Sequence, residues 1–134
     1  MRPGVATFEV FERDGILDRV KDLGERVVAP TVQAWLESHP SVGDVRGTGL
    51  FWAIELVRDR ATGEPLVPFN ASGADAAPMN AVAAACKTAG LWPFVHFNRL
   101  HIAPPLVISE EDLVRGLAII DEALRAADAH VVVK

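Results

Sequence analysis

Two arginines, Arg46 and Arg99, carry the side chains with the most specific chemistry in this sequence. Each flanks an apolar segment that has the pattern of a β-strand, close to a turn. The planar guanidinium of arginine offers parallel N–H donors that can hold a carboxylate by two hydrogen bonds. We therefore identify Arg46 and Arg99 as candidate groups for binding an acidic substrate. The alternative for each is a surface arginine paired with an acid of the same chain.

His96 and His101 are separated by five positions and lie on either side of an expected turn, so both rings can face one metal ion. No Asp, Glu or Cys lies between or beside them, and a zinc site needs at least a third protein ligand. A small metalloprotein using these two histidines is therefore the weakest of the functional alternatives, and we predict no metal site.

Two possible nucleophiles and one glycine motif have simpler explanations. Ser109 precedes three acidic residues and is interpreted as a helix cap, and Cys86 lies in an alanine-rich segment that suits a buried apolar thiol. Gly47-Thr48-Gly49 begins like a dinucleotide fingerprint, but Trp52 stands at the sixth position and a strand follows instead of a helix. This motif is interpreted as a flexible strand entry that permits close backbone approach.

The three lysines are Lys21, Lys87 and Lys134. None lies in a loop rich in glycine or serine, where we would expect a desolvated Schiff-base amine. No pair of carboxylates suited to acid–base catalysis is evident either. Taken residue by residue, the chain offers no complete catalytic site, and we predict no catalytic residue within it.

Apolar periodicity predicts the elements that would position these side chains. Apolar residues at intervals of three and four predict a helix over residues 7–39, with a kink or break at Pro30. Leu50, Trp52, Ile54 and Leu56 alternate along a predicted strand, residues 50–57, whose other face is also largely apolar. A strand that is apolar on both faces is usually covered on both, so we expect a partner surface that this chain does not supply.

The second half of the chain predicts two helices and two short strands. A helix is expected over residues 78–89, strands over residues 91–95 and 99–103, and a last helix after Ser109 with a buried stripe of Leu113, Leu117, Ile120 and Leu124. Together the elements predict an α+β fold. It has a long N-terminal helix and a small, mainly antiparallel sheet of three to four strands, with helices packed on one face.

Length and composition narrow the class of protein. The 134 residues suit a single domain, 1–134, with residues 1–6 and 129–134 expected to fray. The net charge of −5 argues against broad nucleic-acid binding, and the single cysteine excludes an intrachain disulfide. No apolar run reaches the roughly 18 residues of a membrane helix, and no secretory signal is evident. We therefore expect a cytoplasmic protein that binds neither nucleic acid nor membrane.

Three separated segments resemble the C-terminal part of the class III aminotransferases, pyridoxal-phosphate enzymes of fold type I that include ω-amino acid, 4-aminobutyrate and ornithine aminotransferases. They are VATFEVFER at residues 5–13, VRGTGLFWAIEL at residues 45–56 and HIAPPLVIS at residues 101–109. The segments occur in the family's order, and the resemblance extends over roughly residues 4 to 128. It is specific for the superfamily and does not identify a substrate.

The resemblance implies that the chain is a fragment. In the family, a small C-terminal domain packs on a large domain that carries the Schiff-base lysine, the aspartate facing the pyridine nitrogen and the aromatic stacked on the cofactor, and none of these has a counterpart here. A truncated gene, a cloned domain or a mispredicted start at Met1 would each explain this. Alone, the chain is expected to be inactive and to bind no pyridoxal phosphate.

The resemblance also implies which residues face the substrate. The family's small domain closes over the amino acid or keto acid and helps to bind its carboxylate. Ornithine-type members place an arginine two residues before Ala-Pro-Pro, where this chain has His101. A neutral histidine offers a single donor, and Arg99, on the same face of the strand if alternation holds, is the candidate replacement. The candidate substrate-binding residues are therefore Arg99, His101 and Arg46.

A second hypothesis belongs to a different class of function. The same domain can act as a freestanding interaction module that uses its uncovered face for a partner or for self-association. We expect a homodimer through exposed apolar surface when the large domain is absent. The sequence identifies neither the amino donor nor the amino acceptor.

Overall fold

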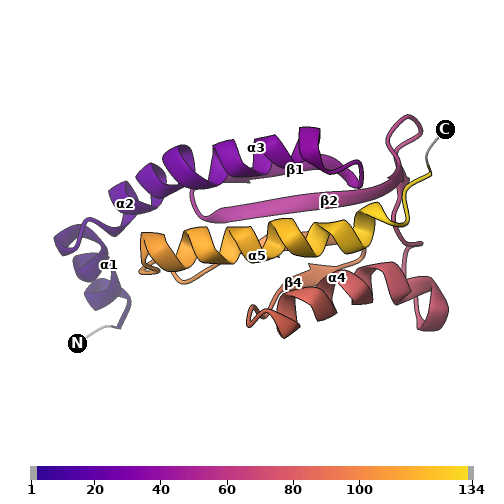
Figure 1. Cartoon of the computed structure of the whole chain (residues 1–134). Coiled ribbons are helices and arrows are strands. Elements are labelled where there is room, and N and C mark those ends of the chain that lie inside the picture. The colour runs from indigo at the N-terminus through magenta and orange to yellow at the C-terminus, as the bar shows by residue number, and fades with distance from the viewer. Residues whose placement is uncertain (1–2, 133–134) are drawn as a thin grey trace.

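The computed structural model describes residues 3–132 and has an α+β fold, as the sequence predicts. Its helices are α1 (Pro3–Arg13), α2 (Ile16–Leu23), the π-helix η1 (Gly24–Val28), α3 (Ala29–Ser38), the short 3₁₀ helix η2 (Gly73–Ala76), α4 (Ala77–Thr88) and α5 (Glu110–Asp128). Its strands are β1 (Val42–Thr48), β2 (Phe51–Asp59), β3 (Glu64–Pro65), β4 (Phe94–His96) and β5 (Arg99–Ile102). All strand pairs are antiparallel, in the order β1-β2-β5-β4, with β3 beside β2. Helices α3, α4 and α5 lie on one face of this sheet (Figure 1).

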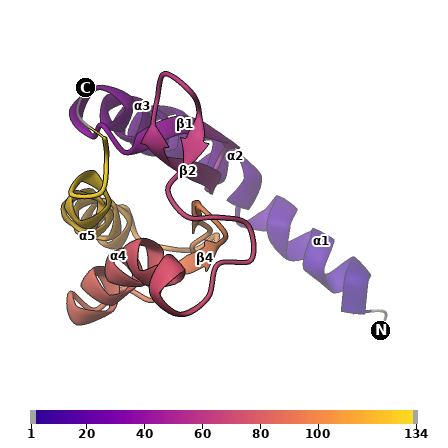
Figure 2. The ribbon, with the colours of Figure 1, turned by 90° about the vertical axis from the view of Figure 1, so that its right-hand side faces the viewer.

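The N-terminal helical region is broken at Gly15 and not at Pro30. Gly15 adopts φ 58, a left-handed conformation that separates α1 from α2, and α1 projects away from the body (Figure 2). Pro30 lies within continuous helix because η1 precedes it, and Ala29 N–H reaches back five residues to the carbonyl of Gly24. The wider π turn relieves the clash that a proline ring makes in an α-helix. A break at Pro30 is therefore wrong, and the irregularity there is the π turn of η1.

Strand β1 was not predicted, because glycines interrupt its alternating pattern. It pairs with β2 from Val42 to Thr48, and the Thr48–Phe51 pair leaves Gly49 and Leu50 as a two-residue turn. Gly49 has φ 53, and a Cβ on Gly24 would lie 2.5 Å from the Gly49 Cα. The Gly47-Thr48-Gly49 motif thus permits close backbone approach, as interpreted from the sequence.

The core lies between the sheet and the helices. Trp52, Ile54 and Leu56 of β2 are buried, as predicted, against Leu100 and Ile102 of β5 and the predicted stripe of α5. Ser109 caps α5 by accepting a hydrogen bond from the Asp112 backbone N–H at 3.0 Å. Val57, expected on the other face of β2, is also buried, because it lies beside Gly43 where the β1–β2 register shifts.

The hairpin of β4 and β5 has a shorter turn than expected. The sequence predicted a turn of residues 96–98, but His96 is the last residue of β4, and Phe97 takes up the positive φ of 57. The buried Asn98 side chain donates to the Leu56 carbonyl at 2.9 Å, which ties this turn to β2.

Residues 129–132 leave the last helix, and Val132 N–H bonds to the Arg58 carbonyl at 2.9 Å. Within residues 3–132, no helix has the length and apolar character needed to cross a membrane. The ends of the chain, residues 1–2 and 133–134, lie outside the described range.

Candidate functional site

One face of the sheet is left uncovered by the helices, and all three predicted binding residues lie on it. Ala53 of β2 pairs with Arg46 of β1 on one side and with His101 of β5 on the other. Glu55 pairs in the same way with Arg99. Directly opposed residues share a face of a sheet, as do residues two apart in one strand. Arg46 and His101 therefore form one row of what we call the open face, and Arg99 lies in the next.

Arg46 is neutralised within the chain. Its Nη2 lies 2.6 Å from Glu55 Oε2, and its Nε lies 3.1 Å from Asp44 Oδ2. The guanidinium thus has two carboxylate partners, Asp44 on its own strand and Glu55 on the neighbouring β2. This geometry corresponds to the alternative considered for Arg46, a surface arginine paired with acids of its own chain.

Arg99 has no such partner. Among residues 3–132 it makes no ion pair, and its buried Nε has no hydrogen-bond acceptor. The acid directly opposite it is Glu55, whose carboxylate is held by Arg46. Arg99 therefore presents an unneutralised guanidinium on the open face, the kind of group that binds a carboxylate or another oxyanion.

His101 lies between two phenylalanine rings. Its ring centroid is 6.2 Å from that of Phe51, at an interplanar angle of 25°, and 5.0 Å from that of Phe94. Burial lowers the pKa of His101 below its ordinary value of 6.5, and the nearby charges of Arg99 and His96 lower it further. The ring is therefore neutral at pH 7, and its buried Nδ1 has no hydrogen-bond partner.

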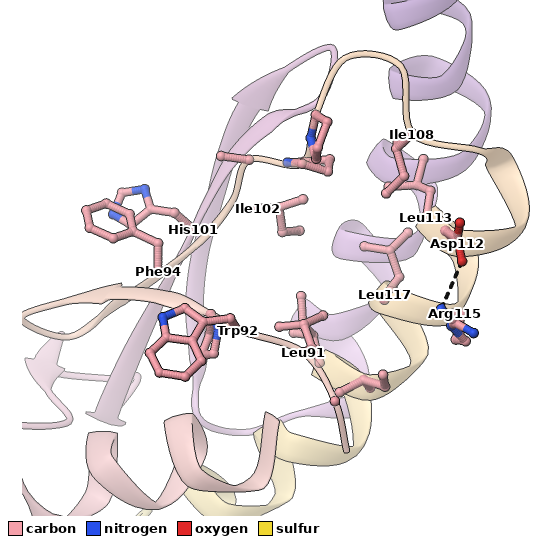
Figure 3. A pocket seen from close by; sticks show the side chains of 18 residues that line it. Leu91, Trp92, Phe94, His101, Ile102, Ile108, Asp112, Leu113, Arg115 and Leu117 are labelled. Atoms are coloured by element: carbon pink, nitrogen blue, oxygen red, sulfur yellow. Dashed lines mark ion pairs between the residues drawn. The ribbon is translucent and has the colours of Figure 1, made fainter. Parts of the chain in front are cut away.

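The two phenylalanines are the site residues that sequence reasoning missed. Phe51 is 60% exposed and Phe94 62% exposed, on strands flanking β5. Figure 3 shows the rings of Phe94 and His101 together on the side of β5 opposite to Ile102, which points toward α5. The sequence signal that could have identified Phe51 is the largely apolar second face of β2, which the sequence analysis interprets only as a surface for a missing partner.

The metal alternative gains no third ligand. His96 pairs with Arg99 across β4 and β5, one row from His101. In the part of the chain that the structure describes, no three His, Cys, Asp or Glu side chains gather as metal ligands would.

A hollow of about 390 Å³ lies behind the sheet, between β5 and the start of α5 (Figure 3). Ile102, Leu113 and Leu117 give it an apolar lining. The ion pair of Arg115 with Asp112, at 2.9 Å, lies at its rim. Phe94 and His101 are also among its lining residues, so the hollow meets the open face beside β4 and β5.

The remaining candidate groups lie away from the open face. Lys21 and Lys87 are exposed on helices, and Lys87 Nζ lies 4.2 Å from the centroid of the exposed Trp92 ring. Lys134 is outside the described residues. Cys86 is buried, as predicted, and burial raises the pKa of its thiol. The exposed positions of Lys21 and Lys87 do not fit a Schiff-base site for an aldehyde cofactor, which needs a desolvated lysine.

Comparison with known proteins gives a consistent family. The model of the family described as "Aminotransferase class-III" matches residues 3–124. An uncharacterised aminotransferase, YhxA, of Bacillus subtilis is 41% identical over 112 residues, covering 78% of this chain and 23% of that protein. A taurine–pyruvate aminotransferase of Bilophila wadsworthia is 34% identical over 131 residues, covering 92% of this chain and 27% of that protein. The chain thus spans about a quarter of the length of these relatives.

Solved structures agree with the sequence matches. The taurine:2-oxoglutarate aminotransferase of Bifidobacterium kashiwanohense, in complex with PLP and glutamate, is 26% identical with a TM-score of 0.84, and the match covers 96% of this chain and 28% of that one. An aminotransferase of Bacillus anthracis is 30% identical with a TM-score of 0.74, over 90% of this chain and 26% of that one.

Proposed function

Because this chain belongs to the class III aminotransferases, we propose that it is the small-domain part of such an enzyme, where it closes over the active site and binds the anionic group of the substrate. The observation that carries this proposal is the unneutralised Arg99 on the open face. An arginine left without an acid, beside an acid already held by Arg46, supports a role in binding an anion from outside the chain.

The partner in this proposal is the large domain of the enzyme. The relatives are much longer than this chain, and their additional length would include such a domain. Exposed apolar side chains lie on the open face and on α1, including Phe51, Phe94 and the 72% exposed Phe8. A surface of this kind is typical of an interface. The large domain would cover Phe8 and its surroundings on α1, and leave the open face, with Arg99, Phe51 and Phe94, facing the active site between the two.

The substrate class is an amino acid or keto acid with an acidic group. Relatives of this chain are aminotransferases that act on taurine, whose acidic group is a sulfonate, and a solved neighbour is bound to glutamate, a carboxylate. A carboxylate is planar and a sulfonate is tripodal, and a guanidinium can bind two oxygens of either group by parallel hydrogen bonds. Arg99 is the residue proposed to bind them, with the neutral His101 beside it as a hydrogen-bonding neighbour.

Pyridoxal phosphate enters this proposal through the rest of the enzyme. When bound, it supplies the electron sink for amino-group transfer. The exposed Lys21 and Lys87 do not fit its covalent attachment, so the proposal assigns no part of that attachment to the described residues. We propose that the chain alone is inactive and binds no pyridoxal phosphate.

One observation favours a second function, an interaction or dimerisation module. Phe51 and Phe94 are 60% and 62% exposed on the open face. Self-association of two chains through the open face would bury these rings. Light scattering of the purified chain tests this, because a monomer at high concentration with no apolar-dye binding contradicts it.

Two measurements test the first proposal. The first reads the coding sequence upstream of Met1. A continuous frame encoding a lysine-bearing domain supports an aminotransferase, and a ribosome-binding site without such a frame supports the freestanding module. The second mixes the chain with pyridoxal phosphate and follows absorbance. The proposal predicts no Schiff-base band that persists on dilution, and such a band would contradict it.

A further inference from the structure

We infer that the open face selects anions that carry an aromatic or bulky apolar body, with Arg99 binding the charge and the Phe51–His101–Phe94 stack binding the body. This inference rests on the proposed function, and it narrows the substrate class within it. It assigns Phe51 and Phe94 as specificity-determining residues.

The Arg99 guanidinium and the Phe51–His101–Phe94 stack are neighbours on the open face. Arg99 and His101 are two residues apart in β5, so their side chains emerge on one face about 7 Å from each other. Phe94 lies directly opposite His101 on β4, and Phe51 is on the other neighbouring strand, β2. A molecule that spans this distance contacts the guanidinium with one end and the rings with the other.

The stack is suited to an apolar body because it carries no charge. Burial, Arg99 and His96 lower the pKa of His101, so the central ring is neutral at pH 7. More than half of each phenylalanine side chain remains exposed. Aromatic rings gain from offset or edge contacts with another ring, beyond the area they bury.

The surroundings leave room and do not repel an anion. Ala53, between Arg46 and His101 in its row, has the smallest side chain of the open face in β2 and forms a low floor beside the rings. Glu55, the acid directly opposite Arg99, is neutralised by Arg46 at 2.6 Å. The open face therefore has a positive end at Arg99 and an apolar end at the stack.

The test compares propionate with 3-phenylpropionate by nuclear magnetic resonance on the isotope-labelled chain. The two carboxylates differ only in the ring. We expect 3-phenylpropionate to bind about three- to tenfold more tightly, with shifts of the Phe51, Phe94 and His101 ring resonances. The double variant Phe51→Leu with Phe94→Leu should remove this advantage while propionate binding is kept. Phe69→Leu, at a 72% exposed ring elsewhere, is the matched control and should preserve the advantage.

The outcomes separate this inference from the proposed function. Equal binding of the two carboxylates, both dependent on Arg99, overturns the inference and leaves Arg99 as the anion site. Ring-dependent binding that survives Arg99→Gln overturns the inference and the assigned role of Arg99 together. Binding of neither carboxylate also overturns the inference, while the upstream reading frame still decides membership of a complete aminotransferase. Loss of the advantage in Phe69→Leu alone contradicts the assignment of Phe51 and Phe94.

Discussion

The Arg46 guanidinium lies 2.6 Å from the carboxylate of Glu55, the residue directly opposite Arg99 in the sheet. One arginine thus removes the acid that would otherwise neutralise the other. Arg46 and Arg99 both flank an apolar strand near a turn, but this pairing makes only Arg99 available to bind an anion. Arg46 is occupied, and Arg99 is left to bind an anion.

Replacing Arg99 with Gln should weaken binding of carboxylates to the open face by about three- to tenfold, because a charge-assisted hydrogen bond is lost at a partly exposed site. Titration of the chain with propionate measures this, and in a complete enzyme the KM for acidic substrates would rise selectively. Arg125→Gln is the control, since Arg125 pairs with Glu122 at the exposed surface of α5. An unchanged affinity in Arg99→Gln would refute the role of Arg99.

Replacing Arg46 with Gln should also weaken anion binding, although Arg46 need not touch the anion. The change frees Glu55, which lies opposite Arg99 and can then neutralise it. Adding Glu55→Gln to Arg46→Gln should restore affinity to near that of the parent chain. If the double variant binds as poorly as Arg46→Gln, Arg46 contacts the anion itself, and the division between the two arginines is wrong.

Gly24→Ala should destabilise the fold by about 1–3 kcal/mol. A Cβ there would lie 2.5 Å from the Cα and carbonyl oxygen of Gly49, and both are backbone atoms that cannot rotate away. Gly116→Ala is the matched control, because its Cβ would meet only Leu91 at 3.5 Å within a helix. That change should stabilise by about 0.5–1 kcal/mol. Urea unfolding measures both, and equal effects would contradict the close approach of η1 to the β1–β2 turn.

Asp128→Ala should destabilise the chain by about 1–3 kcal/mol, since it leaves buried polar groups unpaired. Asp128 accepts hydrogen bonds from the Ser41 backbone at 3.1 Å and hydroxyl at 2.6 Å, and its second oxygen lies 2.7 Å from His39 Nδ1. These contacts join the end of α5 to the connection between α3 and β1. Glu122→Ala, which removes only an exposed pair with Arg125, should change the unfolding free energy by less than about 0.5 kcal/mol. Similar losses in both variants would argue against this joint.

His101 should make the chain less stable as the pH falls. Its folded-state pKa is lowered below 6.5, so the unfolded state binds the proton first. The stability that the neutral His101 ring contributes is complete above pH 6.5, and it is lost as the pH falls from 6.5 toward the lowered pKa. Urea unfolding at about pH 7.5 and about pH 5.5 should show a smaller decline for His101→Gln than for the parent chain. An identical decline would mean that the ring is not desolvated as described.

The sequence predicts the parts of the fold that depend on periodicity. Alternation along residues 50–57 and the stripe from Leu113 to Leu124 both point to faces that the structure buries. The strand β1 escapes this reasoning because Gly43 and Gly47 interrupt its pattern, and it is defined by pairing with β2. The position of the helix break also depends on three-dimensional context, since η1 allows Pro30 to remain within a helix.

The sequence identifies the three polar residues of the candidate site, but it does not show which arginine is unpaired or which rings lie beside His101. Arg46, Arg99 and His101 were each identified from the sequence, and the strand register brings them to one face. Which arginine remains unpaired depends on the pairing of Asp44 and Glu55 beside Arg46. The aromatic neighbours of His101 come from two other strands, so no spacing within β5 reveals them.

The most direct test of the account follows the arginine Nε–H signals of the ¹⁵N-labelled chain while propionate is added. We expect a saturable shift of the signal of Arg99, whose Nε has no acceptor in the described structure, with little change at Arg46. A saturable shift of Arg46 with Arg99 unmoved, or no shift of either signal, would contradict it.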